Sequence, residues 1–302
     1  MDVSHQVDEY IRNSFFFGSC LIILFGLTNT PVTFQHFINN IFSDLLNVYV
    51  VMYLNNILIY SNDILQYQKH VKEVLKWLCK VGLYTKAGKY EFYLDLVEYL
   101  GYILSPDSLT MSNAKVKNIQ EWPEPKKIKN IQLFFSFTNF YRHFIYNYSN
   151  IVMPLTHFTR KNTPWKFDDK CQKAFKSLKK SFISAPILIH WLLNAQLIVE
   201  TNSLDYTLAA ILSIITDNNE VYPVAFHSQT FSTPKLNYNV HDKELLVIFK
   251  AFWIWWHYLE RSALLIDIVT DHKNLEYFST TKILIYWQAK WLEYFSQFNL
   301  VI

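Results

Sequence analysis

Two asparagines stand at a place where a protein could have put metal-binding carboxylates. Asn55 and Asn56 interrupt an apolar, β-branched and aromatic segment that runs over residues 49–61. A polar pair between two strand-forming runs predicts a tight β-hairpin with the asparagines at its tip. Paired aspartates there would predict a divalent-metal site, because hard cations prefer anionic oxygen. An amide oxygen carries no charge, so this pair predicts the turn without the metal.

Other residue types that could bind metal do not fall into a useful pattern. His241, His257 and His272 belong to separate predicted elements, which argues against a histidine metal site. The three cysteines, at positions 20, 79 and 171, have neither metal-binding nor redox spacing and fit a reducing compartment. Three tryptophans at 253, 255 and 256 could stack on bases, but their helical neighbours are apolar and predict packing in the core instead.

The composition predicts a folded protein with a substantial core. The chain has 302 residues, of which 51% are hydrophobic and 18% charged, so a disordered chain is excluded. A net charge of +3 permits contact with nucleic acid without arguing for it. The apolar run at residues 15–27 is shorter than the roughly 20 residues of a membrane helix. Acidic residues precede it, so we expect a buried segment, no signal peptide, no membrane partner and an intracellular protein.

The chain contains three consecutive stretches that differ in their pattern of apolar and polar residues. Residues 1–109 hold short apolar runs and one amphipathic helix, predicted at 66–81. Residues 110–185 have a helical pattern, with core-facing residues in 129–145 and a lysine-rich outer face on a helix at 168–181. That face is more often simply solvated than bound to nucleic acid.

The last stretch, residues 186–302, predicts a mixed sheet. Strands are expected at 196–201, 206–214 and 222–228, followed by a helix at 241–259 and a fourth strand at 264–271. Three consecutive strands and a crossover helix imply antiparallel pairs, one parallel pair and a helix packed on the sheet.

Specific motifs throughout the chain resemble those of a known family. FGLTNTPVTFQHFIN from residue 25, YLNNILIYS, LGYILSP, EWPEPK and NFYRHFI resemble the reverse transcriptase of gypsy-class LTR retrotransposon polyproteins. VETNSLDYTLAAILS, NYNVHDKELL and TDHKNLEYF resemble the RNase H domain that follows it. The resemblance implies an α+β chain. It would comprise a partial fingers and palm in residues 1–109, a mainly helical thumb-connection in 110–185, and a C-terminally truncated RNase H-like domain in 186–302.

The resemblance also implies which residues belonged to a polymerase site. Asn55 and Asn56 occupy the positions of the paired aspartates that hold two Mg²⁺ ions in the family, where Mn²⁺ can substitute. The third aspartate of the family lies in an upstream strand that this chain does not contain. Phe25 and Gly26 match a template-contacting loop, and Asn29 and Gln35 match positions near the primer and the incoming nucleotide. Without metals, Phe25 and Gly26 are equally core residues, and Asn29 and Gln35 equally surface polar groups.

For RNase H activity the family uses four carboxylates around two Mg²⁺ ions. Glu244 and Asp271 match two of them and could hold at most one metal ion, weakly. Asn202 stands where the first aspartate belongs, and the fourth position lies beyond residue 302. Glu200 and Asp205 lie near Asn202, but strand geometry points each away or displaces it along the strand.

The departures from the family pattern share one origin in the gene. Asn for Asp at 55, 56 and 202, and Ser for Gly at 108 and 136, are each reachable by one C-to-T or G-to-A transition. The scarcity of glycine, five in 302 residues, points the same way. Three interpretations stay open. The chain is an RNA-directed DNA polymerase with RNase H activity, a domesticated, non-catalytic nucleic-acid-binding or structural module, or a decayed remnant with no role. The sequence says nothing about oligomeric state.

Overall fold

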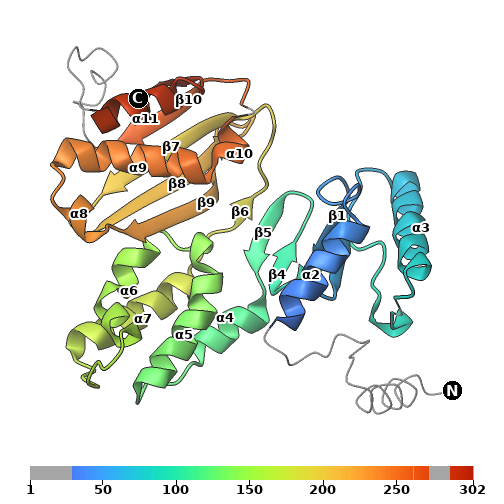
Figure 1. Ribbon diagram of the computed structural model, residues 1–302, viewed down its shortest axis with the longest axis horizontal. Helices are drawn as coiled ribbons and strands as arrows, with labels where there is room; N and C mark the ends of the chain where they lie inside the picture. The colour runs from blue at the N-terminus through green and yellow to red at the C-terminus, as the bar shows by residue number, and fades with distance from the viewer. Residues whose placement is uncertain (1–28, 84, 261, 272–285, 302) are drawn as a thin grey trace. The chain divides into compact units, whose positions relative to one another are not determined.

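The computed structural model describes residues 29–83, 85–260, 262–271 and 286–301 (Figure 1). The chain divides into two compact units, Met1–Leu94 and Asp95–Ile302. Helices and strands alternate irregularly in both, as expected for an α+β protein. Among the described residues, no helix combines the length and the apolar character that a membrane span requires.

The first unit packs two helices on a hairpin. Its elements are α2 (Thr30–Ile41), β1 (Val50–Tyr53), β2 (Asn56–Ile59), α3 (Ile64–Lys80) and the 3-10 turn η2 (Ala87–Lys89). The Asp63 carboxylate caps α3 by accepting a hydrogen bond from the Gln66 backbone N–H at 3.1 Å. The predicted helix therefore begins two residues earlier than expected. The core of this unit contains Ile38, Phe42, Val50, Met52, Val74 and Leu78.

The second unit begins with a small antiparallel sheet and a helical layer. The sheet has the order β3-β4-β5-β6 and consists of β3 (Val97–Tyr99), β4 (Tyr102–Leu104), β5 (Ser108–Met111) and β6 (Leu188–Ile189). Between β5 and β6 lie α4 (Asn113–Gln120), α5 (Ile128–Phe140), η3 (Arg142–Phe144), α6 (Tyr148–Thr156), η4 (His157–Thr159) and α7 (Asp169–Ile183). On α7 the four predicted core residues, Cys171, Phe175, Leu178 and Phe182, are all buried.

A five-stranded mixed sheet follows, in the order β11-β10-β7-β8-β9. Strands β7 (Gln196–Ser203), β8 (Thr207–Ile215) and β9 (Val221–Thr230) are antiparallel, whereas β10 (Ile266–Thr270) runs parallel to β7. The helices are α8 (Thr233–Leu236), α9 (Val240–Ile254), α10 (Trp256–Leu259) and α11 (Tyr286–Phe295), and β11 (Leu300–Val301) is the other edge strand. The predicted meander and crossover helix are confirmed, and α9 lies across the strands (Figure 1).

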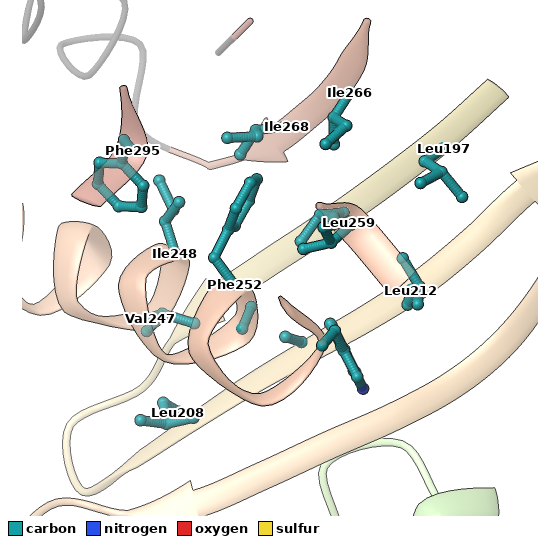
Figure 2. Packing of buried hydrophobic residues seen from close by; sticks show 14 of the residues in the cluster. Leu197, Leu208, Leu212, Val247, Ile248, Phe252, Leu259, Ile266, Ile268 and Phe295 are labelled. Atoms are coloured by element: carbon teal, nitrogen blue, oxygen red, sulfur yellow. The ribbon is translucent and has the colours of Figure 1, made fainter. Parts of the chain in front are cut away.

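The two faces of this sheet are covered by different layers. On β7, Leu197 and Val199 are buried and face α9. Figure 2 shows Phe252 and Ile248 of α9 packed with residues of β7, β8 and β10. Side chains of alternate residues point to the opposite face, where Ile211 and Phe226 join the core of the helical layer.

The tryptophan prediction is wrong for two of the three residues. Trp255 is 4% exposed and packs in the core, but Trp253 and Trp256 are 57% and 52% exposed. Trp253 lies within α9 but on the face away from the buried Phe252, and Trp256 begins a separate short helix after α9 ends at Ile254. Only one of three closely spaced tryptophans can then face the sheet.

Adjacent positions on α9 supply a test of this packing. Phe252 is fully buried, so Phe252→Ala removes a large apolar side chain and leaves a cavity. We expect it to lower the free energy of unfolding of the second unit by about 3–5 kcal/mol. Trp253→Ala, the matched control, removes an even larger side chain from an exposed position and should cost about 1 kcal/mol or less. Chemical denaturation checks both, and equal losses would contradict the orientation of α9.

Candidate functional site

The hairpin of the first unit forms as predicted, but its tip is shifted by one residue. Tyr53 pairs with Asn56, so the two-residue loop consists of Leu54 and Asn55, and Asn56 begins β2. The prediction placed Asn55 and Asn56 together at the tip and is wrong in that register. Leu54 adopts a φ of +52°, in the left-handed region that costs a non-glycine residue roughly 1–2 kcal/mol. Both asparagine side chains are exposed.

The side chain of Gln35 holds this strained turn in place. Its Oε1 atom accepts a hydrogen bond from the Leu54 N–H at 2.6 Å, and its Nε2 atom donates to the Met52 carbonyl at 3.3 Å. Nε2 also donates to Asn39 Oδ1, at 2.8 Å. One amide group therefore binds both the Met52 carbonyl of β1 and the Leu54 N–H of the loop, which gives Gln35 a structural role that sequence reasoning did not assign.

For the other residues assigned to nucleic-acid contact, the described residues show no contact that indicates a function. Asn29 is exposed at the start of α2, where its carbonyl accepts hydrogen bonds from the N–H and the hydroxyl of Thr33, both at 3.0 Å. Phe25 and Gly26 lie outside the described residues. Within the described part of the chain, no three His, Cys, Asp or Glu side chains converge as a metal-binding group.

In the second unit, the sheet brings Asn202 and Asp271 to neighbouring positions. Thr201 of β7 pairs in parallel with Thr270 of β10, so the next residue of each chain segment lies at the same level of the sheet. On its other side, Asn202 pairs with Ala209, which pairs with Ser228. Adjacent strands are separated by about 4.8 Å, so a carboxylate at 202 could share a cation with Asp271.

Glu244 reaches the same end of the sheet from α9. Its side chain is 2% exposed, and Oε1 accepts a hydrogen bond from the Ser203 N–H at 3.2 Å. Oε2 accepts one from the Thr270 hydroxyl at 3.4 Å. The carboxylate thus joins the ends of β7 and β10, next to Asn202 and Asp271. A buried carboxylate that already binds two protein donors has less capacity left for a metal ion.

The neighbouring acidic residues do not complete the site. Glu200 lies two residues before Asn202, on the same face of β7 but displaced by about 7 Å along the strand. Asp205 is exposed in the turn between β7 and β8.

Tyr146, between η3 and α6, contacts Asn202, and sequence reasoning did not predict this contact. Its hydroxyl forms a hydrogen bond with the Asn202 side chain. Burial raises the pKa of the Tyr146 phenol above its usual value; the Asn202 hydrogen bond opposes that shift, and the charges of Asp271 and Glu200 add to it. The contact joins residues 56 positions apart in the chain, and no local pattern in the sequence could have revealed it.

Two family models match separate segments of the chain. Residues 7–104 match the family model for reverse transcriptase (RNA-dependent DNA polymerase). Residues 167–266 match the model for the RNase H-like domain found in reverse transcriptase. The Tf2-7 and Tf2-3 transposon polyproteins of Schizosaccharomyces pombe are each 34% identical over 255 residues, which is 84% of this chain. The chain spans only 19% of the length of these relatives.

Solved structures share the fold. A foamy viral protease-reverse transcriptase dRH in complex with double-stranded DNA aligns with a TM-score of 0.72 and 19% identity, over 91% of this chain and 49% of that one. The foamy viral protease-reverse transcriptase in complex with an RNA/DNA hybrid aligns with a TM-score of 0.69 and 18% identity, over 92% and 38%. The fold is therefore that of a partial reverse transcriptase palm followed by an RNase H-like domain.

The role of Gln35 generates a prediction for the hairpin. Gln35→Ala removes both hydrogen bonds to the turn and should destabilise the first unit by about 1–3 kcal/mol, because it leaves the strained Leu54 N–H without its partner. Amide hydrogen exchange at Leu54 should accelerate accordingly. Asn39→Ala is the control, since it removes only the bond between the two side chains. Unchanged exchange at Leu54 in Gln35→Ala would show that the hairpin holds its own turn.

Proposed function

We propose that this chain, which joins a reverse transcriptase segment to an RNase H-like domain, is part of a gypsy-class retrotransposon polyprotein whose two catalytic sites have lost their charge. The family activity is RNA-directed DNA polymerisation together with hydrolysis of RNA in RNA–DNA hybrids. The observation that carries the proposal is the placement of asparagine at both sites: Asn55 and Asn56 at the hairpin, and Asn202 beside Asp271. Domain limits of 1–109, 110–185 and 186–302 belong to the same proposal.

The donor groups present do not fit two Mg²⁺ ions at either site. At the hairpin the two family positions carry neutral amides, which supply oxygen geometry without compensating the charge of the cations. At the sheet end, Glu244 is buried and occupied by Ser203 and Thr270, which leaves Asp271 as the one exposed carboxylate of the family set. Two-metal phosphoryl transfer requires protein ligands that replace water around both cations. The side chains at these two positions do not supply enough charged ligands, so we expect neither reaction to proceed.

A non-catalytic nucleic-acid-binding module is the second candidate function. The observation that favours it is the exposed lysine row on α7, formed by Lys170, Lys173, Lys176 and Lys180. Phosphate backbones bind such rows with a steep dependence on salt. Hybrid binding that weakens sharply with salt, in the absence of cleavage, would favour this module over a remnant with no role.

Loss of both activities is directly measurable. We expect the purified chain to extend no primer on RNA or DNA templates with Mg²⁺ or Mn²⁺, and to leave the RNA strand of an RNA–DNA hybrid intact. The physical reason is the missing negative charge at positions 55, 56 and 202. An active reverse transcriptase in parallel reactions controls for the substrates. Extension or cleavage by the chain as written would contradict the proposal.

Restoring one carboxylate tests the register of the second site. Asn202→Asp places a negative charge beside Asp271 and should tighten Mg²⁺ binding at least about fivefold, because a carboxylate about 4 Å from a divalent cation attracts it strongly even in a watery environment. Isothermal calorimetry measures the affinity. Asn219→Asp, in the exposed turn between β8 and β9, adds the same charge at the other end of the sheet and serves as control. Equal affinities in the two variants would show that Asn202 does not occupy a metal-ligand position.

A further inference from the structure

An open pocket of about 450 Å³ lies beside β9, an edge strand of the five-stranded sheet. It is formed within the second unit by η3, by β9 and by the end of α9. Its polar lining consists of Arg142, His143, His227 and Gln229, and its apolar lining of Ala225, Phe226, Ile254 and Trp255. None of these lining residues is acidic, so a guanidinium and two imidazoles face the space without a carboxylate among them.

The guanidinium of Arg142 is held in a fixed position with donors to spare. One nitrogen donates a hydrogen bond to the Ser228 carbonyl of β9, and the other donates to Asn139 Oδ1 at 3.4 Å. The guanidinium carbon also lies 5.7 Å from the ring centroid of Tyr148. A guanidinium carries five N–H groups in a rigid fork, so these two bonds position it and leave other N–H groups to bind a ligand.

The two histidines of the pocket have lowered pKa values, which a bound anion would raise. The Nε2 atom of His227 is buried and has no hydrogen-bond partner among the described residues. Burial, followed by the charges of Arg142 on η3 and Lys250 on α9, lowers the pKa of His227 to about 4. Burial and the Arg142 charge also lower the pKa of His143, whose ring packs on Phe144 with centroids 4.7 Å apart. Both imidazoles are therefore neutral near pH 7 beside a permanent cation.

We propose that this pocket binds a phosphate group, held by the Arg142 guanidinium and by the imidazoles of His143 and His227. A tetrahedral oxyanion can accept charge-assisted hydrogen bonds from several donors at once, which the three cationic or protonatable groups supply. The phosphate is either free, as inorganic phosphate or a monoester, or belongs to a nucleic-acid backbone. The site is separate from Asn55, Asn56 and Asn202 and does not depend on catalysis.

The proposal has a defined pH dependence. A bound anion favours the charged form of each imidazole and therefore raises the pKa of His143 and His227. By linkage, this proton uptake raises the affinity for a phosphate of fixed charge, such as a backbone phosphodiester, as the pH falls through the range in which the bound form takes up protons. The charged groups that act on His227 are Arg142 and Lys250.

The experiment is an NMR titration of the histidine rings in the 302-residue chain. His143 and His227 resonances are assigned by comparison with His143→Gln and His227→Gln. Three probes are added separately at about pH 6 and about pH 8: inorganic phosphate, a nucleoside 5′-monophosphate, and an RNA–DNA hybrid without terminal phosphates. We expect at least one probe to shift both rings, to raise their pKa, and to bind several-fold tighter at the lower pH. A response to inorganic phosphate identifies a free-phosphate or monoester site, and a response to the hybrid alone identifies a backbone contact.

Variants at Arg142 distinguish binding in this pocket from non-specific attraction of an anion to a basic protein. Arg142→Gln should weaken the responding probe by about tenfold or more, since one charge-assisted interaction is lost. Arg142→Lys retains the charge and should retain part of the affinity, which also controls for misfolding through loss of the Ser228 contact. Lys72→Gln removes an equal charge from the exposed face of α3 and should leave binding unchanged. Absence of any shift at His143 and His227, or equal losses in Arg142→Gln and Lys72→Gln, would overturn the proposal.

Discussion

The burial of α9 against β7, β8 and β10 is the constraint on which the candidate site depends. Phe252, Ile248 and Val247 enter the same core as Leu197, Val199 and Ile266 (Figure 2). Because side chains alternate along a strand, fixing Leu197 and Val199 toward the helix sends Glu200 and Asn202 to the other face. The same packing inserts Glu244 between the ends of β7 and β10. Hydrophobic burial thus positions polar residues that contribute little stability of their own.

This arrangement explains how a site can lose its charge while the fold persists. Glu244 is stabilised by the Ser203 N–H and the Thr270 hydroxyl, and neither contact involves a metal. The hairpin of the first unit is held by a side chain of the protein, since Gln35 hydrogen-bonds the Met52 carbonyl and the Leu54 N–H. Replacing aspartate by asparagine at such positions removes mutual repulsion between carboxylates and leaves the hydrophobic core unchanged.

The helical layer of the second unit contributes residues to the far face of the sheet. Ser149 of α6 donates its backbone N–H to Ser228 Oγ at 2.9 Å, Arg142 binds the Ser228 carbonyl, and Tyr146 contacts Asn202. Phe226 and Ile211 complete this interface with apolar surface. Polar groups on the sheet that an isolated domain would expose to water are thereby paired within the chain. The same interface creates the pocket beside β9, in which cationic groups gather without a carboxylate.

The sequence by itself determined the α+β class, the order of the strands in 196–270 and the helix that crosses them. These follow from local information: hydrophobic periodicity, turn residues and motif spacing. Strand register at the hairpin was decided by tertiary contacts, because Gln35 stabilises Leu54 at positive φ and moves Asn56 into β2. Trp253 proved exposed because it lies on the outer face of α9, and Trp256 because it begins a separate helix after a break that apolar spacing does not encode. Tyr146 and Arg142 gained their partners 56 and 86 residues away, and such contacts depend on the packing of whole layers and not on any local pattern.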